Sequence, residues 1–136
     1  MVAMSFRRIA SIYGAAATAV GLLLMGWGPM FLESFGTFVH SDYGSNSLIR
    51  LAGVGFFLAG GVLLAVRTVQ DLVLQRRVSF AMVAAHVLGA LVVLAQQGAI
   101  WGSSLGVALD GWLWLAGISF AIVLIRVRQQ GSAAQA

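Results

Sequence analysis

The sequence of 136 residues contains no cysteine and few charged side chains. Without cysteine the chain forms no disulfide, no thiolate metal site and no thiol redox centre. Only 9% of the residues are charged, whereas soluble domains average about 25%. The hydrophobic share of 60% and the mean hydropathy of +0.96 agree with this shortage of charge. These values exclude an ordinary soluble domain and predict one membrane domain over residues 1–136.

Four apolar runs make up most of the sequence, at about 9–28, 48–66, 80–100 and 109–125. Each run is close to the ~20 residues that a helix needs to cross the hydrocarbon core of a bilayer. Four crossings take the chain back and forth across the membrane. We therefore predict an all-α fold in which four transmembrane helices form an antiparallel bundle.

Local features of the sequence predict where these helices begin and end. The single proline, Pro29, has no N–H to donate, so we expect the first helix to end before it. The segment 68–75 contains no helix breaker, and we expect the connection 67–79 to extend the second helix. Asp110 is expected to cap the start of the fourth helix, with its carboxylate at the positive end of the dipole. The small, polar tail 129–136 is expected to fray.

All eight basic residues are arginines, and their placement predicts the topology. One side of the four-helix path carries seven of them: Arg7, Arg8, Arg67, Arg76, Arg77, Arg126 and Arg128. Only Arg50 falls on the other side. By the positive-inside rule, this bias places both termini in the cytoplasm. It also accounts for the net charge of +4, so we predict no nucleic acid as a partner.

The tryptophans are predicted to lie on the opposite, extracytoplasmic side. They are Trp27, Trp101, Trp112 and Trp114, each close to the outer end of an apolar run. Tryptophan is enriched where the bilayer meets water. We interpret the four residues as one half of an aromatic belt rather than as a ligand cage.

Glycines recur at helical spacing in the first two runs. Gly14, Gly21 and Gly28 are seven residues apart, and Gly53 and Gly60 repeat the same interval. In lipid, helices associate through close packing, which small residues permit. We predict that these glycines form contact seams between helices. The 17 glycines of the chain leave surface for a partner subunit as well.

Polar residues at membrane depth are candidates for function, because they are costly unless paired. His86 lies about two turns into the third run, and Gln97 follows three turns later on nearly the same face. A neutral imidazole ligates a tetrapyrrole such as haem or (bacterio)chlorophyll, or bonds a quinone carbonyl. Three interpretations stay open: hydrogen bonding between helices, which we prefer, binding of such a cofactor, and proton transfer.

Arg50 is the second polar candidate, at the outer start of the second run. Its charge is expected to form an interfacial ion pair with Glu33, Asp42 or Asp110, and an anion or lipid headgroup contact is the alternative. His40 lies near two of these acids, but without the spacing of a metal site, so we predict no metal. No cluster of titratable groups suggests catalysis, so we predict that the chain is not an enzyme.

The stretch 45–65, SNSLIRLAGVGFFLAGGVLLA, resembles the second helix of the DoxX-like group of small bacterial four-helix membrane proteins. The resemblance rests on Asn46, Arg50, Gly53 and Gly60 together with the four-span layout. It covers one helix, and the rest of the chain agrees only in hydropathy. Members of that group are associated with membrane redox complexes, including a small subunit of a quinone-reducing sulfur enzyme. The resemblance therefore implies an accessory role.

The function predicted from the sequence is that of a small non-catalytic subunit in the bacterial cytoplasmic membrane. It would contact lipids and other membrane subunits and stabilise a redox or energy-converting complex. The alternative is a membrane redox protein that binds a quinone or tetrapyrrole through His86. A proton-coupled exporter would need an acidic residue inside a span, whereas the sequence places Glu33 and Asp110 at helix ends.

Overall fold

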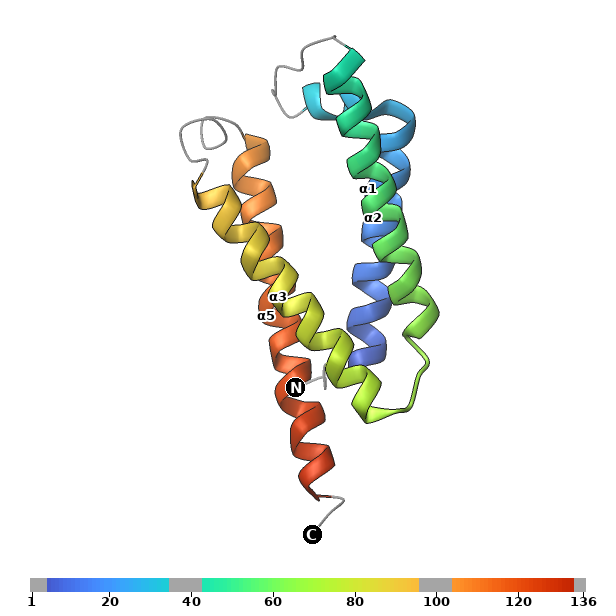
Figure 1. Cartoon of the computed structure of the whole chain (residues 1–136), viewed down its shortest axis with the longest axis vertical. Coiled ribbons are helices and arrows are strands. Elements are labelled where there is room, and N and C mark those ends of the chain that lie inside the picture. The colour runs from blue at the N-terminus through green and yellow to red at the C-terminus, as the bar shows by residue number, and fades with distance from the viewer. Residues whose placement is uncertain (1–4, 35–42, 96–103, 134–136) are drawn as a thin grey trace.

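A computed structural model describes residues 5–34, 43–95 and 104–133. Its helices are α1 (Phe6–Glu33), α2 (Tyr43–Val66), α3 (Leu72–Ala95) and α5 (Ser104–Ala133). Figure 1 shows that α1 runs antiparallel to α2, and α3 antiparallel to α5, so the chain forms two hairpins. The predicted all-α fold with antiparallel helix packing is confirmed.

Three helices are long and apolar enough to cross a membrane. They are Phe6–Glu33, Asn46–Val66 and Val107–Gln130, and each is at least 21 residues long. Among the described residues, α3 is not one of these three helices. Residues 96–100, which complete the predicted third run, lie outside the described part of the chain. The protein is a small multi-pass helical membrane protein.

The first helix continues through its proline, so the prediction that it ends before Pro29 is wrong. Ser5 caps its start by accepting a hydrogen bond from the backbone N of Arg8 at 3.4 Å. The helix is kinked at Trp27, where φ is −128° and ψ is 26°. Proline withholds the bond to the carbonyl four residues earlier and its ring crowds that turn. The helix accommodates the proline by kinking at Trp27 and continues to Glu33.

The connection between the hairpins is not an extension of α2, contrary to the prediction for 67–79. The second helix ends at Val66 and α3 begins at Leu72. The carboxylate of Asp71 accepts a hydrogen bond from the backbone N of Val73 at 2.8 Å, which satisfies an N–H at the start of α3. The Gln75 side chain donates to the carbonyl oxygen of Val69 at 2.6 Å. These local bonds start a new helix where the sequence has no breaker.

The last helix is longer than predicted at both ends. It begins at Ser104 and continues to Ala133, so residues 129–133 are helical and not frayed. Asp110 therefore lies in the second turn of α5, and its predicted role as N-cap is wrong. Trp112 lies about 12 Å along the helix rather than at its start. It is partly buried. Its place in an interfacial belt stays a prediction.

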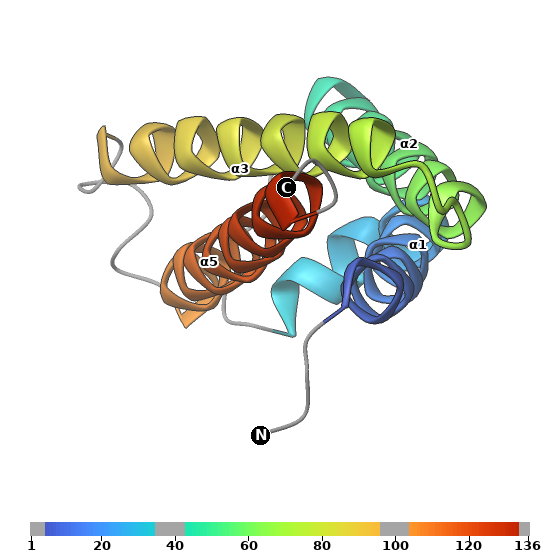
Figure 2. The ribbon, with the colours of Figure 1, turned by 90° about the horizontal axis from the view of Figure 1, so that it is seen from below.

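The two hairpins meet toward one end of the molecule and diverge toward the other (Figures 1 and 2). The meeting end holds the start of α1, the end of α2, the start of α3 and the end of α5. The buried core of this region is formed by Phe6, Ile9, Ala10, Leu63, Phe120, Val123 and Val127. The fold therefore joins its hairpins in the half that also carries most of the arginines, which we call the arginine-rich end.

Candidate functional site

The five glycines at helical spacing lie together between α1 and α2. A Cβ built on Gly21 would come within 2.7 Å of the carbonyl oxygen of Gly53. A Cβ on Gly14 would meet the carbonyl oxygen of Gly60 at 3.1 Å, and one on Gly28 would collide with Ile49. These distances leave no room for a side chain. The five residues form one seam, which we call the glycine seam, in which the two backbones are in contact.

His86 is buried and joins α3 to α1. Its side chain is 4% exposed. Its Nε2 lies 2.6 Å from the hydroxyl of Tyr13, and its Nδ1 lies 2.6 Å from the carbonyl oxygen of Met82. The hydrogen bond to Tyr13 connects residues that are 73 positions apart in the sequence. It is a direct polar link between the two hairpins.

The partners of His86 assign its tautomer. A carbonyl oxygen only accepts, so Nδ1 must carry the proton that it donates to Met82. In a neutral imidazole Nε2 then has the lone pair, and the Tyr13 hydroxyl donates to it. A metal at the centre of a tetrapyrrole would need that same lone pair. Binding one would require Tyr13 to move away.

Aromatic rings surround the bond between His86 and Tyr13. The Tyr13 ring meets Phe120, which is fully buried, edge to face at 5.6 Å, and it stacks on Trp112 at 5.3 Å. His86 stacks on Phe120 with ring centroids 6.2 Å apart. Gly117 lies against His86, since a Cβ at this glycine would be 3.4 Å from that of the histidine. The small residue lets α5 approach the imidazole.

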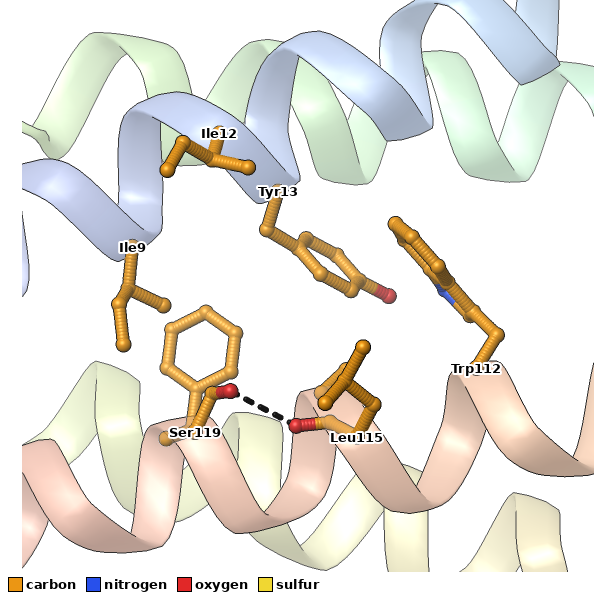
Figure 3. Close-up of a pocket in the computed structure, with 8 residues that line it drawn as sticks. Ile9, Ile12, Tyr13, Trp112, Leu115 and Ser119 are labelled. Carbon is orange, nitrogen blue, oxygen red and sulfur yellow. Dashed lines mark hydrogen bonds between the residues drawn. The ribbon is translucent and has the colours of Figure 1, made fainter.

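An apolar pocket lies beside Tyr13, between α1 and α5 (Figure 3). Its volume is about 120 Å³. Figure 3 shows the indole nitrogen of Trp112 on the side that faces the Tyr13 hydroxyl. The Ser119 hydroxyl donates to the carbonyl oxygen of Leu115 at 2.7 Å, so it is already satisfied within α5. The pocket therefore offers one polar wall, formed by Tyr13 and Trp112, and apolar walls elsewhere.

The sequence reasoning missed Tyr13 and Phe120 as parts of this site. Tyr13 was not among the predicted site residues, although it lies within the candidate span Phe6–Glu33. The rule that singled out His86, a polar group at membrane depth that needs a partner, applies equally to Tyr13. Phe120 carried no such signal, because a phenylalanine inside an apolar run is common.

Other predicted site residues are separated or lie outside the described ranges. Gln97 and Asp42 belong to the segments 96–103 and 35–42, of which the structure says nothing. Arg50 and Glu33 are exposed, and no ion pair joins Arg50 to Glu33 or Asp110 among the described residues. The described ranges also contain no group of three metal-binding side chains. The cofactor role of His86 with Gln97 stays a prediction.

Asp110 is buried inside α5, with 9% of its surface exposed. One of its carboxylate oxygens, Oδ1, has no hydrogen-bond partner in the described part of the chain. It falls within Val107–Gln130, a helix long and apolar enough to cross a membrane. The sequence argument against a proton-coupled exporter placed this carboxylate at a helix end, so that argument no longer holds.

Arginines line two pockets at the arginine-rich end. Arg7, Arg67 and Arg126 line one of about 450 Å³, between α1, the connection and α5. Arg76, Arg77 and Arg128 line another of about 560 Å³, between α3 and α5. Six of the seven arginines predicted to share one side of the membrane therefore gather around two hollows.

Comparison of the chain with protein-family models, curated proteins and solved structures gives no match. The resemblance of residues 45–65 to the DoxX-like group stays a prediction.

Proposed function

We propose that this protein is a small non-catalytic subunit of a larger complex in the bacterial cytoplasmic membrane, with its arginine-rich end in the cytoplasm. The observation that carries the proposal is that α2 has small residues on two faces. Gly53 and Gly60 contact α1, whereas nothing lies within 4 Å of a Cβ built on Gly55. Ala52 and Ala59 are exposed on the same face as Gly55. We call these three residues the free small face.

The free small face suits a second helix better than it suits lipid. Glycine has no side chain to pack against acyl chains, and it weakens a helix by about 1 kcal/mol relative to alanine. Against another helix the missing side chain permits close approach of the backbones, which drives association in a bilayer. The glycine seam of this chain shows the same principle on another face of α2. Exposed leucines and valines, by contrast, need no partner in lipid.

Substitution of Gly55 tests the proposal. The protein should be purified in mild detergent at its native expression level, and the proteins that migrate with it identified. Gly55→Leu should remove the partner and leave the monomer folded, because this position is open. Gly61→Leu is the matched control, since Gly61 is equally open but points away from Ala52 and Ala59. A wild-type chain that migrates alone, or a Gly55→Leu variant that keeps its partner, would contradict the proposal.

A quinone-binding redox protein is the second candidate. The pocket beside Tyr13 favours it, because apolar and aromatic side chains line the pocket and the Tyr13 hydroxyl stands at one side. Both nitrogens of His86 already have protein partners, which argues for a quinone over a tetrapyrrole. Organic extraction of the natively purified protein and an absorption spectrum distinguish these ligands. Recovery of neither a quinone nor a visible band would leave the accessory role as the better proposal.

A further inference from the structure

We propose that Arg76, Arg77 and Arg128 form a binding site for the phosphate headgroup of an anionic membrane phospholipid. They line one pocket of about 560 Å³ between the start of α3 and the end of α5. The other lining residues are Val73, Phe80 and Leu124, and no acidic side chain is among them. The proposal does not depend on the accessory role proposed above.

Residue spacing shows that the pocket is built by two helix faces. Val73, Arg76, Arg77 and Phe80 stand at intervals of three and four residues, which places them on one face of α3. Leu124 and Arg128 are four residues apart on α5. Because these faces belong to different helices, the three arginines line the same volume from two sides.

The order of residues along each helix matches the order of groups in a phospholipid. On α3, Phe80 lies about 5 Å deeper in the membrane than the two arginines, and its side chain is 64% exposed. On α5, Leu124 lies about 6 Å deeper than Arg128. A lipid with its phosphate among the arginines would lay its first acyl carbons against Phe80 and Leu124. A free phosphate ion would make no use of these apolar residues.

Arginine is suited to this ligand by its shape as well as its charge. The planar guanidinium donates two parallel hydrogen bonds to phosphate oxygens and is always charged. The carboxylate of Asp71 accepts a bond from the backbone N of Val73 at the start of α3, and Asp71 does not line the pocket. Basic pockets between membrane helices are recognised sites for anionic lipid headgroups. The positive-inside rule explains arginines on one side, but not their convergence on one hollow.

Native mass spectrometry of the purified full chain tests the proposal by measuring the binding of added phosphatidylglycerol, phosphatidylcholine or inorganic phosphate. We expect phosphatidylglycerol to bind in preference to phosphatidylcholine. The double variant Arg77→Gln, Arg128→Gln should bind phosphatidylglycerol about 25-fold more weakly, a factor of about five for each arginine. The control pair, Arg8→Gln with Arg50→Gln, removes the same charge from residues that line neither arginine pocket, and should change binding less than about threefold.

Further variants identify the source of the phosphate. Phe80→Ala should weaken the lipid and leave binding of inorganic phosphate unchanged. Inorganic phosphate that competes at the same concentration as the lipid would overturn the lipid assignment. If the two double variants lose the same lipid affinity, or if the two lipids bind equally well, binding depends on overall charge and not on this pocket. Either result would overturn the proposal. If the double variant loses its helical circular dichroism, Arg76→Gln alone should still weaken the lipid about fivefold, and an unchanged affinity would refute the site.

Discussion

The two interfaces that hold α1 in place are built from opposite kinds of residue. Toward α2, the helix presents Gly14, Gly21 and Gly28, and the backbones are in contact. Toward α3 and α5, it presents Tyr13, whose ring and hydroxyl meet Phe120 and His86. The first interface depends on the absence of side chains, and the second depends on one polar aromatic side chain.

This difference predicts which part of the fold is stronger. In lipid, apolar burial gives helices little reason to associate, so close packing and hydrogen bonds must hold them. The glycine seam runs from Gly14 to Gly28, about 21 Å along α1. The link through Tyr13 and His86 is a single bond within a small aromatic cluster. We therefore expect the α1–α2 hairpin to be a stable unit and the joint between the hairpins to be the weaker contact.

Gly60→Leu should have the largest effect on stability. Even a Cβ on Gly60 would come within 2.6 Å of the carbonyl oxygen of Gly14 and of the backbone N of Thr18. Backbone atoms inside a helix have no freedom to move aside, so α1 and α2 must separate. We expect a loss of about 3 kcal/mol, the upper end of what overpacking usually costs. Unfolding in mild detergent with increasing dodecyl sulfate measures this change in the free energy of unfolding.

Gly61→Leu is the matched control for this substitution. Gly61 is the next residue along α2, and nothing lies within 4 Å of a Cβ built there. Leucine is also a better helix former than glycine, by nearly 1 kcal/mol. The control should therefore leave stability unchanged or slightly raised. Equal losses at the two positions would mean that the seam does not hold the hairpin together.

His86→Leu should have a smaller effect, confined to the joint between the hairpins. The change leaves the hydroxyl of Tyr13 without its partner in a buried place, which costs about 1–2 kcal/mol. The glycine seam should be intact. Spin labels on the exposed residues Leu58 of α2 and Ile118 of α5 report the distance between hairpins. We expect a broader distribution in the variant, and an identical distribution would show that the histidine does not hold the joint.

The sequence was sufficient to predict the glycine seam but not its pairing. Seven residues are almost two turns of helix, so Gly14, Gly21 and Gly28 must share a face, as must Gly53 and Gly60. That these two stripes meet each other depends on which helices pair. The hydrogen-bond partner of His86 could not be predicted for the same reason, because Tyr13 is 73 residues away in the sequence. Residue spacing shows which residues share one face of a helix, but not which helix packs against that face.

Helix boundaries were the least predictable part of the fold. Pro29 was expected to stop α1, but a kink at Trp27 costs less than exposing the backbone that follows. The start of α3 depends on the hydrogen bond from the backbone N of Val73 to Asp71. No glycine or proline stands beside Asp71 to mark this boundary in the sequence. Because α5 starts at Ser104, Asp110 lies in its second turn rather than at its N-cap, and the side chain is buried. The errors at Pro29 and Asp110 came from equating the ends of an apolar run with the ends of a helix.

Tyr13→Phe should have the smallest effect and gives the sharpest measure of the joint. The variant keeps the ring that contacts Phe120 and Trp112 and removes only the hydroxyl that donates to His86. Hydrogen bonds between membrane helices average about 0.6 kcal/mol, so we expect a loss of this size. Unfolding in dodecyl sulfate, repeated for His86→Leu and for the double variant, completes a mutant cycle. If the hydroxyl and the imidazole act through their shared bond, the double variant should lose less than the two single losses added together. Additive losses would show that the aromatic rings, and not the hydrogen bond, hold the hairpins together.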